Sequence, residues 1–178
     1  SQAKCLLHLV VATDHQDIYD EVSRFGGNVV MTDTAHPSGT DRCLEAADKS
    51  GKEFDFIINI QGDEPFIDPD QIDLLGSQCK ADTEIATLIQ PLTDSNELFN
   101  PNVVKVVRNS NGEALYFSRA TIPAIRDKEK EEWMDSLAYY KHIGMYAYRQ
   151  DILRKVTTLP QGMLEKAESL EQLRWLEA

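Results

Sequence analysis

Three groups of polar residues in this 178-residue sequence have types and spacings that suit chemistry on a charged ligand. The first group, Gln61-Gly62-Asp63-Glu64-Pro65, directly follows a strongly hydrophobic segment. Gly62 allows a backbone to approach a ligand closely, and Asp63 is of a type that holds divalent cations. The alternative is that Asp63 only caps the helix that follows. Taken alone, the motif favours neither interpretation.

The second group is His36-Pro37-Ser38-Gly39-Thr40-Asp41-Arg42. A Ser-Gly-Thr turn that opens a helix offers backbone N–H groups and hydroxyls to an anion or to the edge of a base. Arg42 adds a positive charge to this turn. Taken alone, however, the segment is better explained as an ordinary helix N-cap with a surface arginine.

The third group is spread over the second half of the chain and consists of Arg119, His142, Tyr146, Glu171 and Gln172. His142 and Tyr146 occupy alternate positions of one predicted strand, so both rings fall on one face and can line one pocket. A single histidine on an apolar strand is nevertheless usually structural. Glu171 has the spacing of a solvated helix face. Arg119 follows a strand and has no evident structural role.

Strands and helices alternate in the part of the chain that must position the first two groups. Short apolar runs predict buried strands over 6–12, 28–31 and 54–60. Helices are predicted after them: one carrying Ile18, Val22 and Phe25, one running to about Lys49, and one over 69–80 with a proline in its first turn. Ligands of open α/β sheets bind beyond the carboxyl ends of the strands, which is where the first two groups fall.

The second half of the sequence has a different pattern. Strands are predicted over 85–89, 103–107 and 114–117, and Asn111-Gly112 indicates a hairpin between the last two. The charged run 126–132 is interpreted as a solvated segment, followed by a strand over 141–148 and an amphipathic helix over 163–177. The whole pattern predicts one α/β domain over residues 1–178, with a mixed, mostly parallel sheet and an antiparallel hairpin insertion.

Composition narrows the classes of partner. The 18 Lys and Arg residues against 30 Asp and Glu give a net charge of −12, which disfavours binding to nucleic acid. No apolar run approaches the roughly 18 residues of a membrane span, and the first residues lack the layout of a signal peptide. The three cysteines have no zinc-ligand or Cys-x-x-Cys spacing. We therefore expect a cytoplasmic protein that binds neither nucleic acid nor membrane.

Taken together, the motifs are far more specific than each is alone, and they cover nearly the whole chain. In order, they are His36-x-Ser38-Gly39-Thr40-x-Arg42, Gln61-Gly62-Asp63-Glu64-Pro65, Phe99-Asn100-Pro101-Asn102-x-Val104-Lys105-Val106-Val107, Ala114-Leu115-Tyr116-Phe117-Ser118-Arg119-Ala120-Thr121-Ile122-Pro123, His142-x-Gly144-x-Tyr146-x-Tyr148-Arg149 and Leu170-Glu171-Gln172-Leu173-Arg174. This series resembles the 3-deoxy-manno-octulosonate cytidylyltransferase family, also called CMP-Kdo synthetases.

The resemblance implies a Rossmann-like nucleotidyltransferase fold of the nucleotide-diphospho-sugar transferase type, usually a homodimer. It implies an enzyme that joins CTP to the sugar acid Kdo, with magnesium, to give CMP-Kdo and pyrophosphate for lipopolysaccharide biosynthesis. Asp63 would be the metal ligand and, with Arg119, a catalytic residue that offsets the repulsion between two anionic substrates. The nucleotide would be bound by Ser38, Gly39, Arg42 and Gln61, and the sugar acid by Gln61, Arg119, His142, Tyr146, Glu171 and Gln172.

The sequence departs from this family at both ends. Members begin with a phosphate loop that carries arginine and lysine, and they continue to a strand with a second metal-binding aspartate. We therefore expect the 178 residues to lack the N-terminal phosphate loop and the C-terminal strand. Two alternatives stay open: a CMP-sialate-type cytidylyltransferase, and a relative that binds ligands without catalysis.

Overall fold

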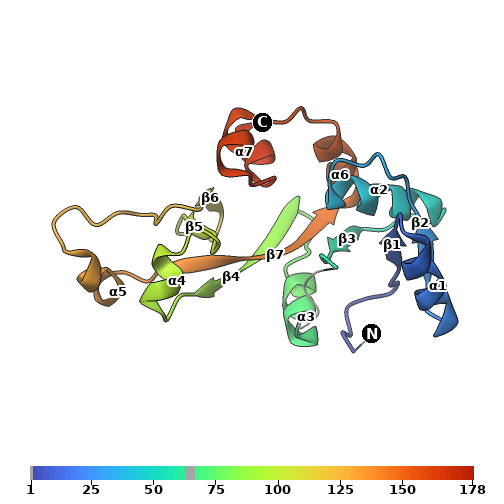
Figure 1. The fold of residues 1–178 in the computed structure, drawn as a ribbon, viewed down its shortest axis with the longest axis horizontal. Helices are drawn as coiled ribbons and strands as arrows, with labels where there is room; N and C mark the ends of the chain where they lie inside the picture. Colours follow the sequence, from blue (N-terminus) through green and yellow to red (C-terminus); the bar gives the residue numbers. More distant parts are fainter. Residues whose placement is uncertain (1, 63–66) are drawn as a thin grey trace. The chain divides into compact units, whose positions relative to one another are not determined.

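The computed structural model describes residues 2–62 and 67–178 (Figure 1). Its contacts divide the chain into two compact units. Unit 1 comprises Ser1–Thr87 and Gly144–Thr158, and unit 2 comprises Leu88–Ile143 and Leu159–Ala178. Among the described residues, no helix combines the length and the apolar character that crossing a membrane requires.

Unit 1 alternates strands and helices, as its sequence pattern predicts. Its elements are β1 (Val11–Thr13), α1 (Gln16–Arg24), β2 (Val29–Met31), α2 (Gly39–Lys49), β3 (Phe56–Asn59), α3 (Pro69–Ser77), the first part of β4 (Ile85–Pro91), the last part of β7 (Tyr140–Arg149) and α6 (Gln150–Thr157). The predicted strand over 6–12 is wrong in extent, because β1 begins only at Val11.

The helices of unit 1 begin where their capping residues predict. Ser38 is the N-cap of α2 and accepts a hydrogen bond from the backbone N–H of Asp41 at 3.3 Å. Asp68 caps α3 in the same way, and Pro69 occupies the first turn, where a missing N–H costs nothing. The helix predicted from Ile18, Val22 and Phe25 is confirmed as α1, although only Val22 is buried, while Ile18 is 48% and Phe25 68% exposed.

Strand pairing in unit 1 is mixed. β1 and β2 are parallel, with Val11 opposite Val29, whereas β3 is antiparallel to β7, with Asn59 opposite Tyr146. Parallel pairing is thus confirmed for β1 and β2, and the expectation of a mostly parallel arrangement is not met by β3. A continuous apolar run indicates that a strand is covered on both faces, but it does not indicate whether the neighbouring strand is parallel or antiparallel.

Unit 2 is built around a β-hairpin and short helices. Its elements are the rest of β4, α4 (Ser95–Phe99), β5 (Lys105–Arg108), β6 (Ala114–Ser118), a 3-10 turn (Lys130–Glu132), α5 (Trp133–Ser136), the first part of β7, α7 (Met163–Glu168) and α8 (Leu173–Glu177). The predicted hairpin is confirmed: β5 and β6 are antiparallel, and Gly112 takes a φ of 91° in the turn between them.

The predicted helix over 163–177 is wrong. α7 ends at Glu168, Ser169 takes left-handed backbone angles (φ 52°, ψ 49°), and α8 begins at Leu173. The break allows Leu170 and Leu173 to pack with Val106 and Phe117 of the hairpin, whereas Ala167, three residues before Leu170, is exposed. The apolar spacing continues through the break, so periodicity alone does not reveal it.

Candidate functional site

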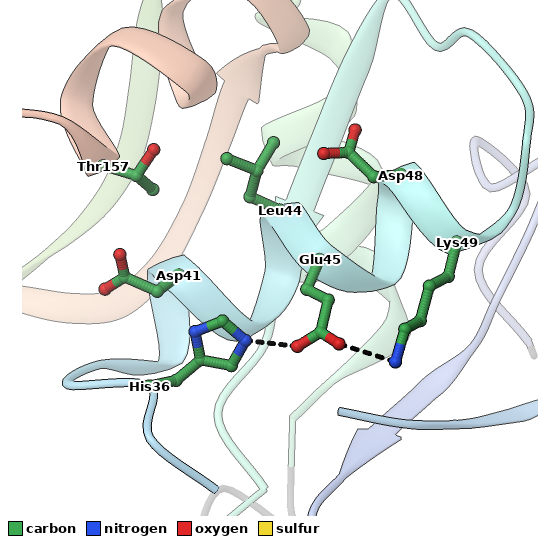
Figure 2. A pocket seen from close by; sticks show the side chains of 7 residues that line it. All are labelled: His36, Asp41, Leu44, Glu45, Asp48, Lys49 and Thr157. Carbon is green, nitrogen blue, oxygen red and sulfur yellow. Dashed lines mark hydrogen bonds and ion pairs between the residues drawn. The ribbon is translucent and has the colours of Figure 1, made fainter. Parts of the chain in front are cut away.

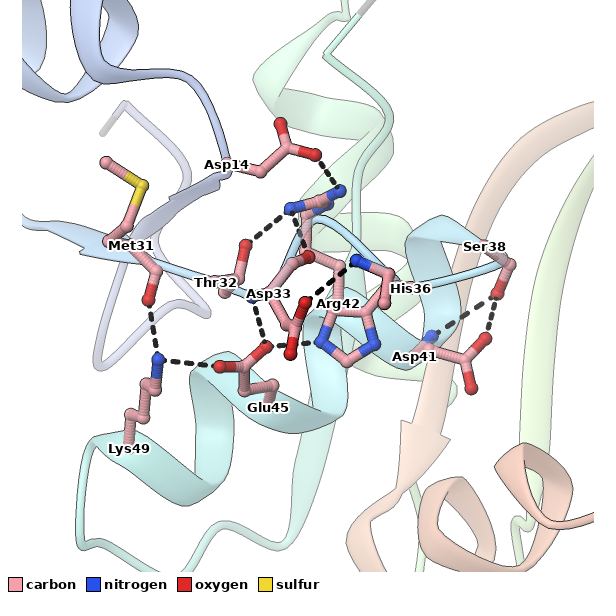
Figure 3. Close-up of polar contacts among 11 residues, drawn as sticks. Asp14, Met31, Thr32, Asp33, His36, Ser38, Asp41, Arg42, Glu45 and Lys49 are labelled. Carbon is pink, nitrogen blue, oxygen red and sulfur yellow. Dashed lines mark hydrogen bonds and ion pairs between the residues drawn. The ribbon is translucent and has the colours of Figure 1, made fainter.

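Arg42 ties together the carboxyl ends of β1 and β2 (Figure 3). Its Nη1 donates to Thr32 Oγ1 at 2.5 Å, and its Nη2 forms an ion pair with Asp14 Oδ2 at 2.7 Å. Asp14 follows β1 and Thr32 follows β2. The hydrogen bond from Arg42 lowers the pKa of Asp14 below its ordinary value. Arg42 is therefore positioned by the fold and is not a mobile surface arginine.

The turn that opens α2 lies against Gln61. A Cβ added to Gly39 would lie 3.2 Å from Gln61 Nε2 and 3.3 Å from Gln61 Oε1, so glycine is what allows this approach. The hydroxyl of Ser38 donates to Asp41 Oδ2 at 2.5 Å as well as capping the helix. Gln61, from the first polar group, thus lies beside the second polar group in unit 1, and the N-cap role of Ser38 is confirmed.

Glu45 holds the segment between β2 and α2 in place, a role that the sequence analysis missed. Its carboxylate pairs with His36, accepts from Asp33 N–H at 2.9 Å, and forms an ion pair with Lys49 at 2.6 Å (Figure 3). Lys49 also donates to the carbonyl of Met31 at 2.7 Å. The hydrogen bond from Lys49 is the main cause that lowers the pKa of Glu45 to about 2. The i,i+4 spacing of Glu45 and Lys49 was the available signal.

A shallow hollow on α2 is separate from the predicted ligand residues. Figure 2 shows its lining, which comprises His36, Asp41, Leu44, Glu45, Asp48, Lys49 and Thr157. None of the predicted nucleotide or sugar-acid residues is among them. Glu45 is bonded to His36 and Lys49, which also line the hollow, and these contacts hold the lining side chains in place. We therefore assign this hollow a structural role and not a catalytic one.

Tyr146 lies in unit 1, on the strand that pairs with β3. It is opposite Asn59, both residues are buried, and the ring of Tyr146 stacks on that of Tyr148 with centroids 5.7 Å apart. Asn59 precedes Gln61 by two positions. The structure therefore places Tyr146 in the same unit as the predicted nucleotide-binding residues.

Asp63, the predicted metal ligand, lies outside the described residues. Within 2–62 and 67–178, no three His, Cys, Asp or Glu side chains gather into a group that would hold a metal ion. The metal role of Asp63 therefore stays a prediction from the resemblance.

Arg119, in unit 2, is held by backbone carbonyl groups. Its Nε donates to the carbonyl of Glu168 at 2.7 Å, and its Nη1 and Nη2 donate to the carbonyls of Pro101 and Ser169, each at 3.3 Å. The expectation that Arg119 has no structural role is therefore wrong. It failed because the partners lie 18 to 50 positions away in the sequence.

His142 is a half-buried, neutral ring of unit 2. Its edge meets the ring of Phe117, with centroids 5.0 Å apart and planes at 76°. Burial lowers the pKa of His142 to about 4, so at neutral pH the ring carries no charge. A neutral imidazole carries one hydrogen-bond donor and one acceptor.

The two predicted residues between α7 and α8 are largely withdrawn from solvent. Gln172 is buried, and its Nε2 has no hydrogen-bond partner among the described residues. Glu171 is half-buried, with one oxygen 3.9 Å from Arg174 Nη2. The alternative of an ordinary solvated helix face, given for Glu171, is therefore wrong, because Glu171 lies between the two helices and is half-buried.

The predicted site residues thus fall into two sets. Unit 1 contains Ser38, Gly39, Arg42, Gln61 and Tyr146, and unit 2 contains Arg119, His142, Glu171 and Gln172. The hypothesis that His142 and Tyr146 line one pocket stays a prediction.

Lys105 and Glu168, in unit 2, both contact the backbone of Arg119, a role that the sequence analysis did not predict. Lys105 is fully buried, and its Nζ donates to the carbonyls of Asn100, Val103 and Arg119 at 2.8, 2.5 and 2.7 Å. Burial lowers the pKa of this ammonium group. The signal in the sequence was a lysine inside the valine run 103–107.

Comparisons with known proteins agree with this architecture. A family model described as cytidylyltransferase matches residues 1–178. A solved structure of CMP:2-keto-3-deoxy-manno-octonic acid synthetase complexed with CTP superimposes with a TM-score of 0.88 at 41% identity, covering 99% of this chain and 70% of that one. This likeness defines a nucleotidyltransferase fold with a mixed sheet.

Curated relatives narrow the class further. A 3-deoxy-manno-octulosonate cytidylyltransferase of Cytophaga hutchinsonii is 57% identical over 174 residues, which is 97% of this chain and 70% of that protein. One from Parabacteroides distasonis is 56% identical and covers 99% of this chain and 72% of its own length. The chain belongs to the 3-deoxy-manno-octulosonate cytidylyltransferase family.

Proposed function

We propose that the intact protein activates Kdo with CTP, releasing pyrophosphate and forming CMP-Kdo. The observation that carries this proposal is the likeness, over 99% of the chain, to a CMP:2-keto-3-deoxy-manno-octonic acid synthetase that was solved with CTP. In this reaction a hydroxyl of one anion must attack the α-phosphate of another. The enzyme must therefore supply positive charge and positioning.

On the nucleotide side, the set in unit 1 supports the proposal. Gly39 begins α2, an eleven-residue helix whose N-terminal end carries a partial positive charge that favours an anion. Arg42 brings a fixed positive charge to the carboxyl ends of β1 and β2, and Gln61 lies against the same turn. We assign Ser38, Gly39, Arg42 and Gln61 to the nucleotide.

On the sugar-acid side, Arg119 has the donors to bind a carboxylate. A guanidinium group carries five N–H donors, and three contacts to carbonyl groups are seen here. Two donors thus remain, as far as the described residues show, for the forked contact that suits a carboxylate. Neutral hydrogen-bonding groups for the sugar hydroxyls would come from Gln61, His142, Tyr146 and Gln172, and an acceptor from Glu171.

Asp63 would hold the magnesium ion, which supplies positive charge at the phosphates when bound. We further propose from the resemblance that the protein is cytoplasmic and homodimeric and that it serves lipopolysaccharide biosynthesis. These proposals rest on the family alone.

The proposal is tested by incubating the intact protein with CTP, magnesium and either Kdo or N-acetylneuraminate. We expect pyrophosphate and a CMP-sugar only with Kdo, as detected by ³¹P NMR. Product formed with N-acetylneuraminate instead would favour the CMP-sialate alternative. Binding of CTP and Kdo without product would indicate a relative that does not catalyse.

A further inference from the structure

Glu168, the last residue of α7, holds both the backbone and the side chain of Arg119. Its Oε2 accepts from the backbone N–H of Arg119 at 2.9 Å, and its carbonyl accepts from Arg119 Nε at 2.7 Å. Its Oε1 accepts from the hydroxyl of Ser118 at 2.7 Å. One residue of α7 thus fixes the end of β6 and the first atoms of the Arg119 guanidinium.

The other side of the Arg119 backbone is held by Lys105. The buried Nζ of Lys105 donates to the carbonyl of Arg119 at 2.7 Å, and its other two contacts are also uncharged carbonyls. Glu168 is the anion whose attraction favours the charged form of this lysine. Lys105 and Glu168 therefore hold the C=O and the N–H of Arg119 with opposite charges.

The break between α7 and α8 completes this arrangement. Because Ser169 takes a left-handed conformation, two successive carbonyls, those of Glu168 and Ser169, both accept from the Arg119 guanidinium. A left-handed conformation at a residue other than glycine is unfavourable and persists only where its surroundings fix it. Here these contacts fix the orientation of the guanidinium before any ligand arrives.

We propose that Glu168 is a positioning residue, which preorganises Arg119 so that the remaining guanidinium donors are ready for the carboxylate of the sugar acid. The inference rests on the proposed function, because that function assigns Arg119 to Kdo. Fixing a binding group in advance removes the cost of ordering it when the ligand binds. Glu168 itself need not touch the substrate.

The test is a set of variants assayed with CTP and Kdo. Glu168→Gln keeps the size of the side chain but removes its charge and one of its two acceptors. We expect kcat/KM for Kdo to fall about 10-fold, with the KM for CTP within about 2-fold of the parent. Glu177→Gln removes the same charge from α8 and should leave both constants unchanged. Ser118→Ala, which removes only one partner of Glu168, should give a smaller fall for Kdo.

A double variant separates positioning from a general structural role. In an Arg119→Ala background, Glu168→Gln should change kcat/KM for Kdo by less than about 2-fold, because its effect passes through Arg119. A full additional 10-fold loss would overturn the inference. So would equal losses for CTP and Kdo together with a lowered Tm. If the parent itself forms no CMP-Kdo, the proposed function is wrong and the inference falls with it; an active parent with an unaffected Glu168→Gln variant refutes the inference alone.

Discussion

Arg119 shows that an arginine whose side chain is hydrogen-bonded to backbone carbonyls can still have donors suited to ligand binding. Three carbonyl contacts fix its plane, and the guanidinium has more donors than these contacts use. Arg42 is similar, since Asp14 and Thr32 hold it at the ends of two strands. Loss of either side chain would therefore affect stability as well as binding, and tests of function need a readout specific to one substrate.

Replacement of Arg119 should weaken the use of Kdo far more than the binding of CTP. Lysine supplies a point charge in place of a planar fork, so Arg119→Lys and Arg119→Ala should both lower kcat/KM for Kdo, by roughly 30- to 1,000-fold. CTP binding, measured by calorimetry without sugar, should stay close to the parent. Arg126→Lys, on an exposed residue of the charged segment, is the matched control. Equal weakening for both substrates would place Arg119 on the nucleotide side.

His142 should remain neutral over the physiological range. Because burial lowers its pKa to about 4 in the folded state, against about 6.5 when unfolded, the unfolded chain binds the proton more readily. The free energy of unfolding therefore has its full value above pH 6.5 with respect to this group. It decreases as pH falls from 6.5 toward 4, by a total on the order of 3 kcal/mol. The His142 ring signal in NMR should titrate well below pH 6. A midpoint near 6.5 would contradict its burial.

Asp63→Asn tests the metal assignment that rests on the resemblance. Asparagine keeps the size and one oxygen but removes the charge, so a magnesium ligand should lose about 100-fold or more in turnover, with little change in Tm. If Asp63 only caps a helix, asparagine is nearly as good and activity should survive. Turnover is measured across a magnesium titration, and a variant that retains most of its activity at saturating magnesium would refute the metal role.

At the scale of elements, Glu45 links the segment after β2 to helix α2. Its pKa is lowered to about 2 by its partners, so its contribution to stability is present above about pH 4.5 and is lost as pH falls from there toward 2. Thermal unfolding of the Glu45→Gln variant should therefore depend less on pH between 5 and 2.5 than that of the parent. Glu131→Gln, on the exposed charged segment, should keep the dependence of the parent. If the Tm of Glu45→Gln and the Tm of the parent change equally with pH, Glu45 does not stabilise the contact between this segment and α2.

Elements with a local signal were the ones that the sequence predicted well. Ser38 and Pro69 mark the beginnings of α2 and α3, and the Asn111-Gly112 pair marks the β5–β6 hairpin. The break at Ser169 has no such signal, because it is stabilised by partners elsewhere, such as the bidentate ion pair of Arg174 with Glu165. Antiparallel pairing of β3 with β7 escaped prediction for the same reason.

The same distinction applies to the candidate site. That Gly39 and Gln61 both lie beyond the ends of strands was predictable from the α/β pattern. Their closeness was not, because β2 and β3 belong to different sheets. The contacts of Glu168 and Lys105 with Arg119 join residues 49 and 14 positions apart, and no local pattern encodes them. The residues assigned to ligands come from motifs and stay a prediction, whereas the residues that hold them in place required the structure.

At the scale of the whole molecule, a chain of net charge −12 must bring together two anionic substrates. Three of its cationic side chains are held in place by hydrogen bonds: Arg42 in unit 1, and Arg119 and Lys105 in unit 2. We propose that Arg42 and Arg119 serve one reaction between CTP and Kdo, and that Lys105 acts by holding Arg119.

The most direct test of this claim is pyrophosphate release by the intact protein, measured with each substrate alone and with both together. The account predicts release only when CTP, Kdo and magnesium are all present, with CMP-Kdo formed in equal amount. Release that does not depend on Kdo, or no release with all three present, would contradict it.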